Sequence, residues 1–227
     1  MARFLGRVWR LGLAVALTAA IMLAALTALW RFAPPVSTLM LARYLTGRPV
    51  VRDYVPLERI APALVASVVM SEDAKFCRHH GVDWQALGDV LDDADEDGPS
   101  RGASTITMQV VKNLFLWPSR SAIRKGMEIP MAMALDFAWP KRRIMEVYLN
   151  IAEWGPDGIF GAQAAAEADF RRNANALTPM QAALLATALP NPILRSPARP
   201  KPGHARLARR VAGRAEGAAP WLDCLRN

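Results

Sequence analysis

Cysteine is scarce in this chain of 227 residues, with only Cys77 and Cys224, far apart in the sequence. Two isolated cysteines exclude a disulfide-rich scaffold and a structural zinc cluster, because each needs more ligands at closer spacing. The two could pair in an oxidising compartment. The sequence does not show whether they meet in space, and we expect Cys77 to be unpaired, partly buried and without a role.

Strand patterns and repeats are also missing. No alternation of apolar and polar residues of any length appears, and no segment repeats another. Hydrophobic residues make up 52% of the chain, which excludes a disordered polypeptide. The length suits one domain of ordinary size and is too short for two large ones. The predicted fold class is therefore mostly α.

Acidic residues are absent from positions 1–31, and the net charge of +8 is concentrated at the two ends of the chain. Positions 195–227 are also strongly basic, whereas the middle of the chain is slightly acidic. A nucleic-acid-binding protein usually carries its basic patch on the folded body, so we expect no nucleic-acid partner. Basic ends suit contact with an anionic membrane or polymer, although they would also simply keep the chain soluble.

The segment from Leu11 to Trp30 contains no charged residue. A helix of this length covers roughly 30 Å, about the thickness of the hydrocarbon layer of a bilayer. Trp9 and Trp30 flank it as interfacial aromatics do, and the preceding arginines predict a cytoplasmic N-terminus. The run exceeds the ~7–15 apolar residues of a typical signal peptide, although alanines could supply a cleavage site. We expect an uncleaved anchor, with the remaining residues outside the cytoplasmic membrane.

Proline and polar clusters divide the chain further. An apolar stripe of Leu64, Val65, Val68 and Val69 predicts a core helix in the stretch that begins at Leu57. Further helices are expected over about 104–116, 121–138, 140–148 and 178–189, the last opened by a capping box at Thr178. The expected organisation is 1–10 cytoplasmic, 11–30 membrane anchor, 31–55 linker, 56–196 folded domain and 197–227 basic C-terminal tail.

The acidic loop at 92–100 partly matches a calcium-binding loop. Asp93, Asp95, Asp97 and Gly98 fit the first ligand positions and the glycine of an EF-hand. The position that needs a bidentate glutamate is Ser104. We therefore interpret this segment as a solvated loop and predict no metal site.

Glu72 and Asp73 follow the apolar helix directly. Apolar neighbours could raise the pKa of a carboxyl group at this helix end and suit it to general acid–base chemistry. Solvent-exposed caps have the same pattern, so this pair alone does not decide between catalysis and capping.

Two further clusters carry cations. At 102–113 a Gly-Ala-Ser-Thr turn opens a helix whose free N–H groups could bind phosphate, with Gln109 and Lys112 on one face; a plain N-cap with a solvated face is the alternative. Arg124 and Glu128 form an i, i+4 pair that a surface salt bridge would explain equally well. Together the clusters suit chemistry on a sugar diphosphate close to a membrane.

In this order and spacing, the motifs resemble those of the peptidoglycan glycosyltransferase family, which also forms the N-terminal catalytic domain of bifunctional penicillin-binding proteins. The resemblance covers about 55–195 and leaves no room for a transpeptidase domain, so it implies the monofunctional type. The implied fold is a single lysozyme-like helical domain after one transmembrane helix. The motifs are Glu-Asp-x-x-Phe-x-x-His-His-Gly (72–81), Gly-Ala-Ser-Thr-Ile-Thr-x-Gln-x-x-Lys-Asn (102–113), Arg-Lys-x-x-Glu (124–128) and Lys-x-x-Ile-x-x-x-Tyr-Leu-Asn (141–150).

This resemblance implies polymerisation of lipid II into β-1,4 glycan strands, with inversion at the anomeric carbon and release of undecaprenyl diphosphate. Glu72 would be the general base for the acceptor's 4-hydroxyl, Asp73 would help to position the site, and Glu128 would lie near the leaving group. The positions expected to contact the diphosphate and the sugars are Ser104, Gln109, Lys112, Arg120 and Arg124.

The resemblance also sets expectations for cofactors, partners and location. It implies no cofactor; a divalent cation assists the diphosphate in some members, but this chain has no dedicated ligand cage. Met108 stands where many relatives have glutamine, which puts one polar contact in question. The expected partners are lipid II, the growing glycan strand and inner-membrane lipids, with cell-wall synthesis or division proteins as further candidates. The expected location is the inner membrane, single-pass, with the catalytic domain in the periplasm.

Two other functions stay open at this point. A lytic, lysozyme-like enzyme also uses a catalytic glutamate in a helical fold, but it needs neither an anchor nor the cations at Lys112 and Arg124, because no diphosphate leaves. An anchored scaffold could instead bind wall polymer or division proteins through the basic region 195–227.

Overall fold

The computed structural model describes residues 2–92, 103–119 and 121–226. Contacts divide the chain into two units, Met1–Pro34 and Pro35–Asn227, each of which is described by itself below.

Some predicted features lie outside the described residues. They are Asp93, Asp95, Asp97 and Gly98 of the acidic loop, and Arg120 of the expected diphosphate site.

The first unit is one long helix, α1 (Ala2–Trp30). Its portion Gly6–Trp30 is apolar and long enough to cross a membrane, and it contains the segment predicted as an anchor. Pro34 and Pro35 follow soon after the helix ends, and proline cannot continue a helix because it lacks the N–H. The unit has the length and composition of a membrane anchor.

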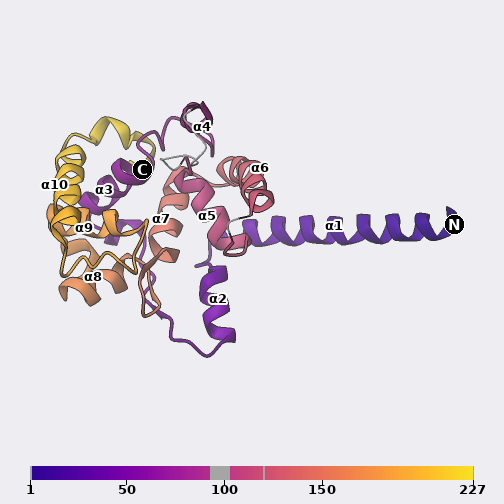
Figure 1. Ribbon diagram of the computed structural model, residues 1–227, viewed down its shortest axis with the longest axis horizontal. Coiled ribbons are helices and arrows are strands. Elements are labelled where there is room, and N and C mark those ends of the chain that lie inside the picture. Colours follow the sequence, from indigo (N-terminus) through magenta and orange to yellow (C-terminus); the bar gives the residue numbers. More distant parts are fainter. Residues whose placement is uncertain (1, 93–102, 120, 227) are drawn as a thin grey trace. The chain divides into compact units, whose positions relative to one another are not determined.

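The second unit is mostly helical, as the sequence predicts, and carries a small sheet (Figure 1). The helices are α2 (Thr38–Leu45), α3 (Pro62–Glu72), α4 (Trp84–Asp92), α5 (Ile106–Phe115), α6 (Ala122–Ala138), α7 (Lys141–Ile151), α8 (Ala162–Phe170), α9 (Pro179–Ala188) and α10 (Pro202–Glu216). The strands are β1 (Val51–Arg52), β2 (Glu153–Gly155) and β3 (Ile159–Phe160). Short 3₁₀ turns are η1 (Leu57–Arg59), η2 (Ala174–Ala176), η3 (Ala219–Trp221) and η4 (Asp223–Leu225).

Helix α3 is buried on every side over most of its length. The predicted stripe of Leu64, Val65, Val68 and Val69 is buried, and so are the residues between these positions and Met70. Helices α9 and α10 pack against α3 and group with it at one end of the unit (Figure 1). Helix α10 lies beyond residue 196, so the packed helices extend into the segment expected as a basic tail.

Helix α5 runs through the middle of the unit and packs against α6 and α7. Its side chains Met108, Val110, Val111 and Leu114 are buried among these helices. Met108 is therefore a core residue, and no polar contact is expected from this position.

The helix ends follow local sequence signals. At α9, Thr178 Oγ1 accepts a hydrogen bond from the N–H of Gln181, and the Gln181 side chain accepts one from the N–H of Thr178, which confirms the predicted capping box. Pro140 was predicted as the first residue of a helix. It is instead the N-cap of α7, the position immediately before the first helical residue, Lys141.

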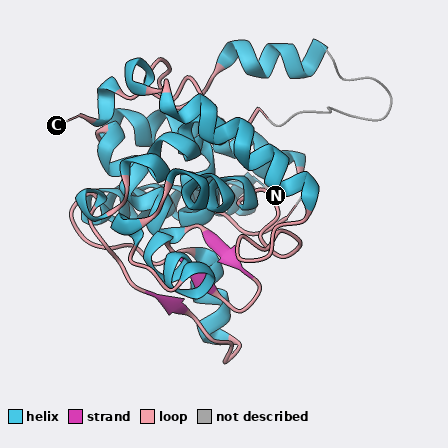
Figure 2. Ribbon diagram, turned by 90° about the vertical axis from the view of Figure 1, so that its left-hand side faces the viewer, coloured by secondary structure: helices cyan, strands magenta, loops and turns pink. Residues whose placement is uncertain are grey.

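The mostly α fold also contains three short strands that no sequence pattern indicated. The three strands form one sheet in the order β1-β3-β2, with β1 parallel and β2 antiparallel to β3 (Figure 2). Each strand has only two or three residues, which is too short to produce an alternating pattern in the sequence.

The expectation of an unpaired Cys77 is also wrong, because Cys77 and Cys224 form a disulfide. The C-terminal turns η3 and η4 return the chain to the turn that follows α3. Arg78 reinforces the junction, since it lies 3.5 Å from Asp223 and donates to the carbonyl of Pro220 at 2.9 Å. The two cysteines meet where the chain returns after α10, which packs against α3.

Candidate active site

Glu72 is the last residue of α3, and its side chain is partly buried. Its Oε2 accepts a hydrogen bond of 3.1 Å from Nε2 of Gln109 on α5. Burial raises the pKa of the Glu72 carboxyl, while the Gln109 hydrogen bond and the charges of Lys112 and Arg195 oppose this shift. A carboxyl group with a raised pKa is better matched to proton transfer near neutral pH than an ordinary exposed one.

Asp73 comes next in the sequence but points into the protein. Its Oδ2 accepts a hydrogen bond of 2.9 Å from the N–H of Ile106, the first residue of α5. Its two carboxylate oxygens lie 3.0 and 3.1 Å from Nε2 of His79. A carboxylate is favourable at a helix N-terminus, where the free N–H groups are positive. Asp73 thus joins the end of α3 to the start of the helix that carries Gln109.

The turn after these carboxylates closes against α6 at Gly81. This residue has φ of 84°, and a Cβ added to it would lie 2.5 Å from the carbonyl oxygen of Ala132. Its own carbonyl accepts a hydrogen bond of 2.6 Å from Thr105, whose hydroxyl also caps α5 by accepting from the N–H of Met108. Glycine is therefore required here, both for its backbone conformation and for the close approach.

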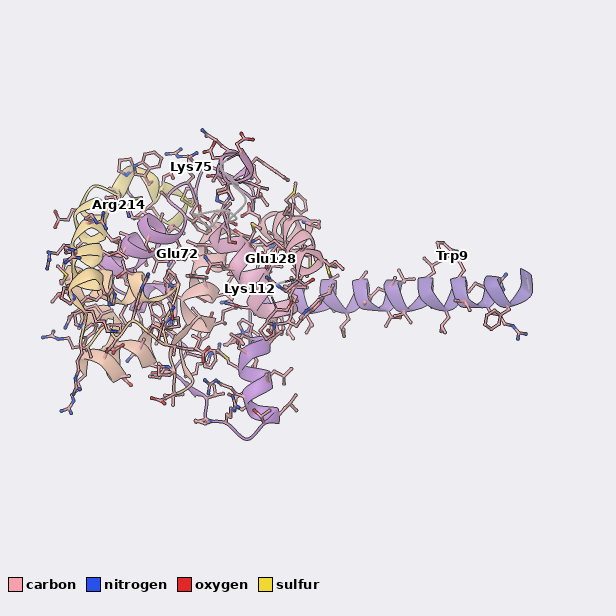
Figure 3. The ribbon with its side chains drawn as sticks, viewed as in Figure 1. Trp9, Glu72, Lys75, Lys112, Glu128 and Arg214 are labelled. Carbon is pink, nitrogen blue, oxygen red and sulfur yellow. A yellow bond between two sulfur atoms is a disulfide. The ribbon has the colours of Figure 1, made fainter. Side chains whose placement is uncertain are left out.

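Lys112 lies on α5, one turn beyond Gln109, and is partly buried. Burial lowers the pKa of the Lys112 ammonium, and the positive charges of Arg124 and Lys125 act in the same direction, whereas Glu128 and Glu72 raise it. Lys112 therefore lies within the electrostatic reach of both carboxylates. Glu72, Lys112 and Glu128 gather in the same part of the unit (Figure 3).

Helix α6 supplies a second charged cluster. Arg124 and Glu128 form the ion pair that their spacing suggests. They are only 9% and 2% exposed, so the pair is buried and the alternative of a surface salt bridge is wrong. Lys125 Nζ lies 2.8 Å from Glu128 Oε2 and donates to Ser104 Oγ at 2.5 Å. Arg124 Nε donates to the carbonyl of Ser119 at 2.8 Å. Because a buried charge is costly without its partner, these contacts hold the cluster in one arrangement.

Two cavities open beside these residues. The first, here called the carboxylate cavity, has a volume of about 210 Å³ and is lined by Glu72, Asp73, Ala74, Lys75, Asp83, Ala86, Ala103, Ser104 and Thr105. The second, the basic cavity, has a volume of about 380 Å³ and is lined by Thr38, Leu39, Lys112, Asn113, Leu116, Pro118, Ser119 and Arg124. One cavity thus presents a carboxyl group of raised pKa, and the other presents cations.

Most of the residues predicted for the site lie in or beside these cavities: Glu72, Asp73, Ser104, Gln109, Lys112, Arg124 and Glu128. The structure adds Lys125, Tyr148 and Arg195, which were not predicted as site residues. Lys125 and Tyr148 belong to the quoted motifs, so their motif membership was an available signal. Arg195 follows the last helix of the resemblance and had no such signal.

Among the described residues, one group of three potential metal ligands is close enough to share an ion: Cys77, Asp223 and Cys224. Both sulfur atoms are in the disulfide and are not available as thiolate ligands. None of these three residues lines either of the two cavities.

Comparison with known proteins gives a consistent picture. A family model described as Transglycosylase matches residues 39–216. A protein of Brucella suis biovar 1 (strain 1330), named biosynthetic peptidoglycan transglycosylase, is 58% identical over 195 residues, which cover 86% of this chain and 87% of that protein. Proteins of the same name are 54% identical in Rhodopseudomonas palustris (strain ATCC BAA-98 / CGA009), covering 97% and 93%, and 52% identical in Agrobacterium fabrum, covering 86% and 85%.

Proposed function

The chain belongs to the transglycosylase family. From that premise we propose that it polymerises peptidoglycan glycan strands and that its two cavities bind different parts of the reacting substrates. The substrate is lipid II. The acceptor sugar enters the carboxylate cavity, and the diphosphate of the donor enters the basic cavity. The observation that carries this assignment is the position of Lys112, which lines the basic cavity and interacts with both Glu72 and Glu128.

Glu72 acts as the general base. Its carboxylate takes the proton of the acceptor's 4-hydroxyl while that oxygen forms a bond to the anomeric carbon of the donor. The bond from this carbon to the diphosphate breaks at the same time, and its electron pair leaves with the diphosphate oxygen. One direct displacement inverts the anomeric centre, as the change from an α-linked diphosphate to a β-1,4 bond requires. Burial of Glu72 supports the role, because a raised pKa makes the carboxylate a stronger base.

The departing diphosphate gains negative charge, and cations stabilise it. Lys112 and Arg124 line the basic cavity, and Lys125 lies next to them on α6. Fixed positive groups in a partly buried site stabilise growing charge more than they would in water, because they need no reorganisation. Lys112 is best placed for this role since it has no hydrogen-bonded carboxylate of its own among the described residues.

Glu128 balances the cations before substrate binds. It pairs with Arg124 and Lys125 and is almost fully buried. Without it, two positive side chains would stand unpaired beside Lys112 and would repel one another. Glu128 therefore keeps the diphosphate-binding cations in place and lies near the leaving group.

A glycan-cleaving enzyme is the second candidate. It would also use a buried glutamate, but no diphosphate leaves in hydrolysis, so the cation cluster would have no task. The buried Arg124–Glu128 pair and the partly buried Lys112 thus favour transfer from a diphosphate donor.

The test uses the purified full chain in detergent, labelled lipid II and gel separation of the products. Glu72→Gln keeps the side-chain shape and removes the base, so polymerisation should fall about 10²- to 10⁴-fold. Glu216→Gln, an exposed glutamate on α10, is the matched control and should polymerise at the normal rate. Normal strand growth by Glu72→Gln contradicts the base assignment. Cleavage of intact wall without strand growth by the unaltered chain supports the lytic alternative.

The proposed location is the inner membrane, with a single span and the catalytic unit in the periplasm. Two observations support it: the apolar helix α1 with arginines at its N-terminal end, and an exposed apolar face on α6. On that face Ile123, Met127 and Phe137 are 76%, 40% and 95% exposed, and their spacing places them on one side of the helix. Because lipid II is confined to the bilayer, both features keep the site close to its substrate.

Deletion of residues 1–31 tests the anchor. The truncated chain should lose more activity against lipid II in vesicles than in detergent, because detergent removes the need to reach a bilayer. An equal loss in both media would contradict the role of α1 in substrate delivery.

A further inference from the structure

Tyr148 on α7 is a buried tyrosine to which the steps above give no task. It is 1% exposed, and its hydroxyl donates a hydrogen bond of 3.1 Å to Oε1 of Gln109. Burial raises the pKa of the Tyr148 hydroxyl well above its ordinary value, so the hydroxyl keeps its proton at neutral pH. Tyr148 therefore remains a hydrogen-bond donor throughout the working range of the enzyme.

Gln109 stands between Tyr148 and Glu72. Its Oε1 faces the tyrosine hydroxyl, and its Nε2 donates to Oε2 of Glu72 at 3.1 Å. A glutamine amide can be turned end for end, because its oxygen and nitrogen have the same shape but opposite roles. The reversed amide would place a carbonyl oxygen against the carboxylate and would withdraw the N–H that stabilises it.

Tyr148 selects between these two orientations. Gln109 is the only hydrogen-bond partner found for its hydroxyl within the described part of the chain. In the reversed orientation, the Tyr148 O–H would face an N–H₂ group and lose its acceptor, which is costly for a buried donor. The orientation that satisfies Tyr148 is the one that presents N–H to Glu72.

We propose that Tyr148 is a positioning residue, which holds the Gln109 amide with its N–H₂ end toward Glu72 and so favours the carboxylate form of the base. This inference rests on the proposed role of Glu72. It assigns to α7 a part in the reaction although Tyr148 itself touches no reacting atom.

Other charged groups also act on Glu72. Lys112 on α5 and Arg195 after α9 stabilise its charge, and Asp73 opposes it. Lys75 and Asp83 line the same cavity and lie 3.7 Å from each other. All of them are retained when only the Tyr148 hydroxyl is removed, so a change in the titration of Glu72 would come from the amide.

The experiment measures kcat/KM for lipid II against pH, which reports the titration of the free enzyme's base. Tyr148→Phe should move the acidic limb upward by on the order of 0.5–1 pH unit, the size expected for the net contribution of one ordinary hydrogen bond. Above the limb, its rate should return to within a few-fold of the unaltered enzyme. Tyr54→Phe removes the hydroxyl of a partly buried tyrosine, which donates to Glu146 away from the cavities, and should leave the limb in place.

Gln109→Met tests whether Tyr148 acts through the amide. It removes the donor itself, so it should shift the limb at least as far, and adding Tyr148→Phe should shift it no further. A uniform loss at every pH with an unmoved limb in Tyr148→Phe, or in Gln109→Met if the tyrosine variant does not fold, overturns the inference. If Glu72→Gln still polymerises lipid II with an unchanged pH profile, the proposed base is wrong instead, and the two failures are thereby distinguished.

Discussion

Removal of the disulfide should cost the catalytic unit much of its stability. The change is Cys77→Ala together with Cys224→Ala. The bond joins residues separated by 147 positions in the sequence. For a loop of this length the chain-entropy relation gives about 5 kcal/mol at 25 °C, because the cross-link removes so many conformations from the unfolded chain. For a unit of this size 1 kcal/mol shifts the melting temperature by roughly 2–4 °C. The expected fall in melting temperature is therefore roughly 10–20 °C.

The other contacts of the C-terminal segment cannot replace the bond. Arg78 pairs with Asp223 on the surface, where both side chains are about half exposed, and such pairs contribute little. Arg142 donates to the carbonyl of Leu225 at 3.0 Å, which is one ordinary hydrogen bond. The disulfide is thus the main link between this segment and the turn that follows Glu72.

The assay is thermal unfolding of the full chain in detergent, followed by circular dichroism. A reductant should lower the melting temperature of the unaltered chain toward that of the double variant, and it should leave the double variant unchanged. A shift of less than about 2 °C in the double variant would refute the reasoning, since even a single weak contact would account for it. Two free thiols in the unreduced, unfolded chain would refute the pairing itself.

Three further predictions concern the site. Glu72→Gln should raise the melting temperature at pH 7. Because burial raises the pKa of Glu72 in the folded chain, the folded chain loses stability as the pH rises from the unfolded pKa through the raised folded pKa. A neutral glutamine does not have this cost. An unchanged melting temperature at pH 7, with Glu216→Gln as control, would contradict this. Lys112→Ala should lower polymerisation about 10²- to 10³-fold in the gel assay, because the departing diphosphate loses one fixed positive charge that stabilises it. A mild effect would contradict a role of Lys112 in binding the leaving group. Gly81→Ala should destabilise by at least about 1 kcal/mol in denaturant unfolding, since alanine tolerates neither the positive φ nor the contact with Ala132; a neutral result would mean that the turn can shift freely.

The sequence by itself determined the elements that depend on local chemistry. The apolar run Leu11–Trp30 of α1 predicts a membrane-length helix, because every side chain in this run is uncharged. The stripe on α3 predicts a buried helix, and Thr178 with Gln181 predicts a helix start, because caps and periodicity involve residues within one or two turns. The motifs also predicted Glu72, Gln109, Lys112 and Glu128 as candidate site residues, and the structure brings these side chains into one region of the unit.

Tertiary structure decided the features that join distant parts of the chain. Cys77 meets Cys224 because α10 packs on α3 and the turn η4 packs on α7, and no spacing rule predicts a contact over that separation. The Arg124–Glu128 pair has the spacing of an exposed helical salt bridge, and only the packing around α6 makes it a buried one. Tyr148 reaches Glu72 through Gln109 because α7 and α5 lie against each other. Burial and the meeting of distant helices set the pKa and the orientation of these groups, and neither property is encoded within a single segment.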